Sequence, residues 1–184
     1  MSVTTERLTV EEYLARDFPP KTQLIHGEVV MNAPTKRHER IAFRIAYLLT
    51  DWIEHGSGSG EAGIGMEWTV GDRDAFIPDA WWVSEAHRPS PQGPRVHAFP
   101  DLVVEVRSAS TWRYDLGPKR ASYEAAGVLE LWLVDIESDT VIVNRRSAAD
   151  APEFDVLTEV GRDAELSSPL LPGFELRLDE LFDR

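Results

Sequence analysis

The sequence predicts an α/β fold with a central β-sheet that is covered on both faces. Residues 102–106 read Leu-Val-Val-Glu-Val, an apolar run typical of a strand in the middle of such a sheet. Residues 36–53 repeat apolar side chains at helical spacing, which predicts a long amphipathic helix. Residues 129–135 and 140–146 are two further apolar runs around a short polar turn, which predicts a pair of strands.

Composition limits the class of protein. The chain has 184 residues, 42% of them hydrophobic, so we expect one sizeable core and a single domain over residues 1–184. No apolar run approaches the ~20 residues that span a bilayer. The first residues lack the apolar core of a signal peptide, and cysteine is absent, so we expect a cytoplasmic protein without thiol chemistry. A net charge of −13 has the wrong sign for binding nucleic acid through the overall field, so a polyanionic substrate needs a local basic patch or a metal.

The first elements are a short helix and a hairpin. Thr9 and Glu12 have the spacing of a capping box, which predicts a helix that begins near residue 10. Residues 24–31 contain two apolar runs around a His-Gly pair, which predicts a β-hairpin. Glu28 lies on the second arm of this hairpin, where an acid more commonly faces water than performs chemistry.

The long helix begins with a positive cluster. Thr35 is the expected N-cap, and Lys36, Arg37, His38 and Arg40 follow it. The helix dipole disfavours cations at this end by ~0.3–1 kcal/mol each, so a phosphate contact by His38 and its neighbours would explain the placement. A solvated turn without function is the more common alternative.

The segment that follows predicts a hairpin of residues 63–70 and 76–83. Pro78 has no amide hydrogen and marks the beginning or edge of the second strand, with Asp79 just inside it. Trp81 and Val83 share its face by strand parity. Asp79 is therefore an acid in an apolar setting.

A Pro-rich loop, residues 88–94, leads to the central strand, which contains Glu105. A carboxylate in a covered strand needs a cationic partner, because burying an isolated charge costs several kcal/mol or more. Strand parity places Asp101 and Arg107 on the same side as Glu105. An ion pair of Glu105 with Arg107 or a lysine, without any chemistry, is an equally good interpretation of this stretch.

The remaining elements are a second helix, an edge strand and a closing segment. Pro118 and Gly127 frame a helix from about residue 118 to 126. Lys119 lies in its first turn, where a cation is disfavoured, so a negative partner is expected close by. Residues 154–160 predict an edge strand, and residues 170–182 a closing segment with a short final helix.

Asp79, Glu105 and a nearby cation form a constellation with a chemical meaning. Carboxylates on adjacent strands supply the hard oxygen ligands that Mg²⁺ or Mn²⁺ prefers. A basic residue, either Arg107 or Lys119, can orient the attacking water and stabilise charge on a phosphorus centre. Spacing of this kind is loose and only moderately specific.

The chain resembles the Uma-type family of putative restriction endonucleases along nearly its whole length. The stretches that carry the resemblance are Leu24-Ile-His-Gly-Glu-Val-Val, Arg37-His-Glu-Arg, Ile77-Pro-Asp, Pro100-Asp-Leu-Val-Val-Glu-Val, Ser108-Ala-Ser-Thr, Asp115-Leu-Gly-Pro-Lys-Arg, Tyr123 with Gly127-Val, Leu131-Trp-Leu-Val-Asp and Ser168-Pro-Leu-Leu-Pro-Gly.

That family belongs to the PD-(D/E)XK nucleases, so the resemblance implies a restriction-endonuclease-like core with a mixed sheet flanked by helices, and the hairpins above are additions to it. Members are often dimeric and mostly cut DNA with Mg²⁺. The resemblance makes Asp79 the first metal-binding acid, Glu105 the second and Lys119 the catalytic lysine. Asp101 and Glu28 become accessory candidates and His38 a weaker one. Arg107 departs from the pattern: it occupies the usual lysine position of the superfamily, where the Uma-type pattern has an apolar residue. This leaves open which cation serves the site.

We therefore expect a metal-dependent endonuclease that hydrolyses phosphodiester bonds of DNA, with Mg²⁺ or Mn²⁺ as cofactor and a homodimer as its assembly. The net charge keeps a different class open, a weakly active or inactive nuclease-fold protein that serves as a dimeric binding or regulatory module. A metal-dependent hydrolase of smaller phosphate esters is a third possibility. The sequence leaves the target site and the biological setting open.

Overall fold

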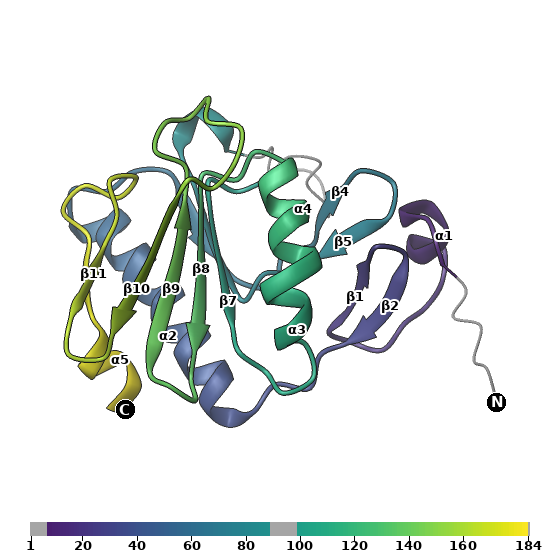
Figure 1. Ribbon diagram of the computed structural model, residues 1–184, viewed down its shortest axis with the longest axis horizontal. Coiled ribbons are helices and arrows are strands. Elements are labelled where there is room, and N and C mark those ends of the chain that lie inside the picture. Colours follow the sequence, from purple (N-terminus) through teal and green to yellow (C-terminus); the bar gives the residue numbers. More distant parts are fainter. Residues whose placement is uncertain (1–6, 89–98, 184) are drawn as a thin grey trace.

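The computed structural model describes residues 7–88 and 99–183 (Figure 1). The helical elements are α1 (Val10–Leu14), α2 (Lys36–His55), η1 (Glu85–His87), α3 (Trp112–Tyr114), η2 (Asp115–Lys119), α4 (Arg120–Ala125) and α5 (Leu178–Asp183). The strands are β1 (Thr22–Ile25), β2 (Glu28–Met31), β3 (Glu61–Gly63), β4 (Trp68–Val70), β5 (Asp74–Phe76), β6 (Ala80–Val83), β7 (Leu102–Val106), β8 (Glu130–Asp135), β9 (Thr140–Arg145), β10 (Val156–Gly161), β11 (Glu165–Ser167) and β12 (Glu175–Arg177).

The largest sheet has six strands in the order β10-β9-β8-β7-β6-β3. Strands β7 and β8 run parallel, whereas all other neighbouring strands described in this sheet run antiparallel. The sheet is therefore mixed, with α2 behind it and α4 in front of it in Figure 1. This confirms the expected fold class, a mixed sheet flanked by helices.

Strand β7 shows why both faces are covered, because every one of its residues is buried. Leu102, Val104 and Val106 pack into the core that contains the apolar stripe of α2. Val103 packs into a second core on the face of α4, beside Tyr123. Glu105 shares the parity of Val103, so its carboxylate is directed into the α4 side of the sheet.

A second sheet, β2-β1-β5-β4, lies beside the first. The predicted hairpin of β1 and β2 is confirmed, and its turn has positive φ at His26 (49°) and Gly27 (79°). Thr9 caps α1 with the expected capping box, and Thr35 caps α2 by accepting a bond from the amide of His38. The amphipathic helix predicted from residue 36 is also confirmed.

The hairpin predicted from residues 63–83 is wrong as a single unit. Strand β3 pairs with β6 in the large sheet, whereas β4 pairs with β5 in the small one. Pro78 lies between β5 and β6, where it cannot donate to a ladder, and the chain passes there from one sheet to the other. Asp79 consequently lies immediately before β6 and not inside it.

The helix after β7 begins earlier than the sequence indicates. Helical backbone starts at Trp112 and continues through α3, η2 and α4, with Pro118 inside one wide π-helical turn. A proline inside an α-helix clashes with the preceding turn, and a π-type turn is one way to accommodate it. Lys119 therefore lies in the middle of a helical run, and the prediction that placed it at a helix start is wrong.

The end of the chain follows the prediction, with β10 as an edge strand and α5 as a final helix, although the small β11 and β12 pair was not expected. The Pro-rich loop of residues 88–94 lies outside the described residues except for Arg88. Within residues 7–88 and 99–183, no helix combines the length and apolar character needed to cross a bilayer.

Candidate functional site

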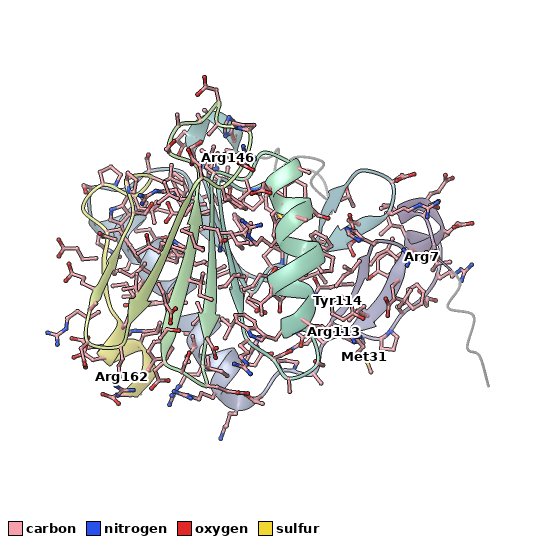
Figure 2. The ribbon with its side chains drawn as sticks, viewed as in Figure 1. Arg7, Met31, Arg113, Tyr114, Arg146 and Arg162 are labelled. Atoms are coloured by element: carbon pink, nitrogen blue, oxygen red, sulfur yellow. The ribbon has the colours of Figure 1, made fainter. Side chains whose placement is uncertain are left out.

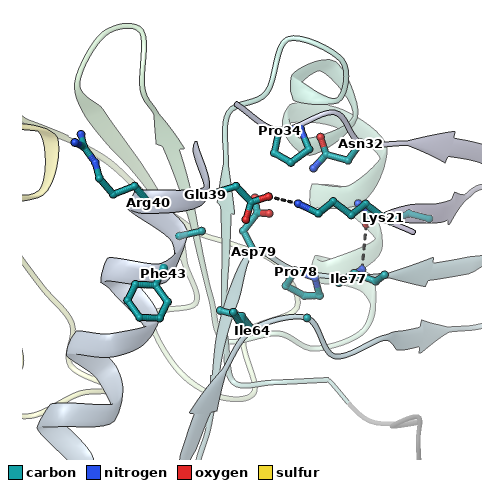
Figure 3. A pocket seen from close by; sticks show the side chains of 13 residues that line it. Lys21, Asn32, Pro34, Glu39, Arg40, Phe43, Ile64, Ile77, Pro78 and Asp79 are labelled. Atoms are coloured by element: carbon teal, nitrogen blue, oxygen red, sulfur yellow. Dashed lines mark hydrogen bonds and ion pairs between the residues drawn. The ribbon is translucent and has the colours of Figure 1, made fainter. Parts of the chain in front are cut away.

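A cleft of about 630 Å³ opens where α2 meets the junction of the two sheets (Figure 3). One wall is the start of α2, and the opposite wall is the β1–β2 hairpin with the segment that precedes it. The segment between β5 and β6 closes one side and places Asp79 in the cleft. Lys21 and Glu39 form an ion pair across the opening.

The backbone of β7 holds Asp79 through both its amide and its carboxylate. Its amide donates to the carbonyl of Val104 at 3.1 Å, and its Oδ2 accepts from the amide of Val106 at 2.8 Å. These two residues flank Glu105, so the structure brings together two acids that are 26 positions apart in the sequence. Asp79 directly precedes β6, which pairs with β7, so the two acids lie on neighbouring segments, although only Glu105 lies within a strand.

His38 is closer to the site than the sequence indicated. Its ring is buried, with a side chain 2% exposed, and Nε2 lies 3.1 Å from Oδ2 of Asp79. This is an ion-pair approach more than a well-aligned hydrogen bond. Burial lowers the pKa of His38, but the attraction of Asp79 outweighs it, so the pKa of His38 is raised. His38 thus lies against Asp79, whose charge favours the protonated form of the imidazole ring.

Glu105 is buried on the α4 face, where two donors meet the same oxygen. Lys119 Nζ lies 2.6 Å from Oε1, and the hydroxyl of Tyr123 donates to Oε1 at 2.5 Å. Burial raises the pKa of Glu105 above its ordinary value; the ammonium of Lys119 opposes the rise, and the charges of Asp115 and Asp79 add to it.

Of the two cations considered for Glu105, Lys119 is the one that contacts it, and its side chain is only 1% exposed. Its Nζ also lies 3.0 Å from Oδ1 of Asp115, one helical turn before it. Burial lowers the pKa of Lys119, but Asp115 and Glu105 outweigh burial and hold it above the ordinary value. Burial raises the pKa of Asp115, and Thr111 donates a hydrogen bond to its Oδ2.

Asp115 and Tyr123 were not among the predicted site residues. The signal for Asp115 is its spacing of four residues from Lys119, which brings the two side chains together on one helical run. Pro118 conceals this signal, because a proline is typical of the first position of a helix and so predicts that the helix begins after Asp115. The signal for Tyr123 is its position four residues after Lys119, on the buried side of α4.

Arg107 turns away from Glu105. Its guanidinium lies 2.8 Å from Asp135 Oδ2 and 2.7 Å from Glu137 Oε2, and it covers the ring of Trp112 at 5.6 Å. The strand ends at Val106, so the parity argument that placed Arg107 beside Glu105 does not extend to it.

Asp101 and Glu28 lie elsewhere. Asp101 precedes β7 at the end opposite Glu105, where it accepts a bond from the amide of Ser84 at 2.7 Å and contacts His87 at 2.6 Å. Glu28 accepts a bond from the hydroxyl of Tyr114 at 2.9 Å (Figure 2 labels Tyr114). Neither acid contacts Asp79 or Glu105 among the recorded interactions of the described residues.

The two central acids fit a hard divalent cation. Among the described residues, Asp79 forms its hydrogen bond and ion pair through Oδ2, and Glu105 forms its own through Oε1. Each carboxylate therefore has one oxygen left for another ligand. No group of three or more His, Cys, Asp or Glu side chains suited to a metal is found within residues 7–88 and 99–183. Mg²⁺ is satisfied by one or two carboxylates with waters and substrate phosphates, so a pair of acids is sufficient for it.

Comparison with known proteins places these features in context. The family model described as "Uma2: Putative restriction endonuclease" matches residues 10–179. A solved structure, described as a putative nuclease belonging to DUF820 from Anabaena variabilis, superposes with a TM-score of 0.81 at 18% sequence identity. The match covers 96% of this chain and 98% of the other, and at this identity it shows a shared fold. Among curated proteins, none matches the chain.

Proposed function

Because the chain belongs to the Uma2 family of putative restriction endonucleases, we propose that it is a metal-dependent endonuclease that hydrolyses phosphodiester bonds of DNA. The observation that carries this proposal is the buried ammonium of Lys119 on the carboxylate of Glu105, next to a second acid, Asp79, that lines a cleft. The pKa values of Glu105 and Lys119 are both raised, and groups with perturbed pKa values beside an acid that lines a cleft are a common arrangement of an active site.

In this proposal Asp79 and Glu105 hold Mg²⁺ or Mn²⁺. Such a cation, when bound, supplies Lewis-acid stabilisation of phosphate charge. Asp79 is already oriented by the backbone of β7 and by His38, and Glu105 by Tyr123 and Lys119. Both carboxylates are therefore held in place before any ligand arrives, and this lowers the cost of ordering them on binding.

Lys119 acts in this proposal as an electrostatic residue and not as a base. Its pKa is raised, so the ammonium stays charged at neutral pH and cannot accept a proton. A fixed cation stabilises negative charge that develops on the phosphoryl oxygens, and it can orient the attacking water. Asp115 is a positioning residue in this proposal, because its carboxylate forms a second ion pair with the ammonium.

A nuclease-fold binding or regulatory module with weak or no activity is the second candidate. Two observations favour it: the net charge of −13, and the ion pair that already occupies one oxygen of Glu105. A homodimer and a cytoplasmic location are compatible with both proposals. The family resemblance supports the homodimer, and the composition supports the cytoplasmic location.

Nicking of supercoiled plasmid in Mg²⁺ or Mn²⁺, compared with EDTA, tests the endonuclease. We expect metal-dependent cleavage by the wild type and by Asp101→Asn, the control for an acid outside the cluster, and none by Asp79→Asn. Calorimetric titration with Mn²⁺ should show weaker binding for Asp79→Asn. Equal metal affinity in wild type and Asp79→Asn removes Asp79 from the site, and absence of cleavage by folded, metal-loaded wild type favours the binding module.

A further inference from the structure

We propose that the cleft beside Asp79, together with the exposed face of α2, binds single-stranded DNA, with an unpaired base stacked on the ring of Phe43. This inference rests on the proposed function and specifies the form of its substrate. Two sets of side chains carry it: apolar side chains exposed in the cleft, and cations without partners beside them.

Phe43 and Ile64 line the same cleft as Asp79, yet their exposed fractions are 63% and 53%. Figure 3 shows them below Asp79, Phe43 from α2 and Ile64 from the connection after β3. No aromatic ring pairs with Phe43 among residues 7–88 and 99–183. Exposed apolar side chains that gather at one cleft mark a surface that another molecule covers.

Cations accompany Phe43 along α2. The residues at positions 36, 40, 43, 44 and 47 share one helical face, and we call this face the α2 stripe: Lys36, Arg40, Phe43, Arg44 and Tyr47. Lys36 and Arg40 have no ion-pair partner in the described part of the chain, and with Arg37 they line a second hollow of about 600 Å³. The guanidinium of Arg44 lies 5.7 Å from the centre of the Tyr47 ring.

The charge of the stripe is complementary to phosphate in a chain whose net charge is −13. Cations that track the backbone, interleaved with rings that face outward, are the features of surfaces that bind single strands. A polyanion would therefore meet local attraction at α2 despite repulsion by the rest of the molecule.

The apolar side chains distinguish a single strand from a duplex. In a duplex the faces of the bases are covered by stacking, so a protein reaches mainly phosphates and groove edges. Stacking on an aromatic side chain requires an unpaired base. The volume of the cleft, about 630 Å³, lies in the ~300–1,000 Å³ range of pockets that enclose a ligand. A duplex held only by its phosphates would leave Phe43 and Ile64 uncovered.

Fluorescence anisotropy in EDTA, with a labelled single strand of about 12 nucleotides and the matching duplex, measures binding without cleavage. We expect Phe43→Ala to bind the single strand about tenfold more weakly or worse, the usual effect of removing one stacking ring, with duplex affinity changed less than about twofold. Phe43→Trp should retain binding, because it keeps a ring. Arg40→Ala should reduce the slope of log affinity against log salt by about 0.7, the contribution of one phosphate contact on a single strand.

Leu157→Ala is the matched control. Leu157 is 71% exposed and lies on β10, at the edge of the large sheet opposite β3, so its loss should leave binding unchanged. Equal affinity of wild type and Phe43→Ala for the single strand overturns the inference. Tighter Phe43-dependent binding of RNA overturns its assignment to DNA. A wild-type dimer that dissociates in Phe43→Ala by sedimentation, with unchanged DNA binding, assigns the stripe to a second copy of the chain instead.

The outcomes separate this inference from the proposed function. Metal-dependent plasmid cleavage that requires Asp79, together with single-strand binding that is indifferent to Phe43, refutes the stripe and keeps the nuclease. Phe43-dependent binding of the single strand without cleavage in any metal refutes the nuclease and keeps the binding surface.

Discussion

Lys119 is buried between two carboxylates, and under the proposed function it has two separable roles. The first is electrostatic, because a preorganised cation next to the proposed scissile phosphate stabilises developing charge. The second is structural, because the same ammonium neutralises acids that burial would otherwise make costly.

For the catalytic role, we expect Lys119→Ala to lower the single-turnover rate of DNA cleavage by ~10²–10³, the usual scale for losing one preorganised electrostatic group. Metal affinity should change little, because Lys119 is not a metal ligand in the proposal. Arg107→Ala is the comparison: its guanidinium is committed to Asp135 and Glu137, so its effect on the rate should be small. A nearly inactive Arg107→Ala beside a near wild-type Lys119→Ala would reverse the assignment.

For the structural role, we expect Lys119→Met to cost much more free energy of unfolding in EDTA than Glu105→Gln. Removing Lys119 leaves Glu105 and Asp115 buried without their cation, which costs ~3–5 kcal/mol. Removing the charge of Glu105 leaves a neutral pair of Lys119 and Asp115, and a glutamine oxygen can still accept from Tyr123, so a cost of ~1 kcal/mol is expected. Chemical denaturation of both variants measures the order, and the opposite order would contradict the arrangement of charges.

Among the elements, the β1–β2 hairpin depends on its turn. Gly27 has φ of +79°, its amide donates to the carbonyl of Arg73 at 2.8 Å, and its carbonyl accepts from the amide of Leu8 at 2.8 Å. A Cβ added there would meet the carbonyl oxygen of Leu8 at 2.9 Å. The turn thus ties the start of the chain and β5 to the hairpin that forms one wall of the cleft.

This geometry predicts that Gly27→Ala destabilises the protein more than Gly127→Ala. Both glycines have positive φ, which costs a residue with a Cβ ~1–2 kcal/mol, but a Cβ at Gly127 meets nothing within 4 Å. The backbone clash at Gly27 adds to the strain, because Leu8 is buried and its amide is hydrogen-bonded to the carbonyl of Gly27. Thermal melting of the two variants should give the lower midpoint for Gly27→Ala. Equal midpoints would show that the turn relaxes freely.

At the scale of the whole molecule, Glu130 connects the central sheet to the closing segment. It lies on buried β8, and its two oxygens accept from Trp132 Nε1 at 2.6 Å and from Ser168 Oγ at 2.7 Å. Burial raises the pKa of Glu130, although both hydrogen bonds oppose the rise. The large sheet therefore contains an acid that is costly to ionise.

The free energy of unfolding depends on pH because the pKa of Glu130 differs between the folded and the unfolded chain. The unfolded chain releases the proton of Glu130 near the ordinary value of 4.5, and the folded chain only at higher pH. Between these values the free energy of unfolding falls as pH rises, and the full penalty applies above the folded pKa. Glu130→Gln removes it, so its melting temperature should exceed that of the wild type at pH 8, with the difference narrowing toward pH 4. A difference that does not vary with pH would show that folding does not raise the pKa of Glu130.

Local patterns predicted much of the fold, because they depend on neighbours in the sequence. The capping box at Thr9, the N-cap at Thr35 and the apolar run of β7 each act within a few residues. The π-helical turn at Pro118 was missed because a proline, judged by its sequence neighbours alone, indicates a helix start. The division of β3 to β6 between two sheets depends on partners that are distant in sequence.

The sequence by itself determined that Asp79 and Glu105 are acids in apolar surroundings and that a basic residue must lie near them, because burial of a charge demands a partner. Only the tertiary structure decided which partner. It directed Arg107 to Asp135 and Glu137, enclosed Lys119 between Glu105 and Asp115, and placed His38 behind Asp79. These choices follow from where β7 ends and how the helix after it passes over the sheet. Strand parity cannot report such relations, since it ends with the strand.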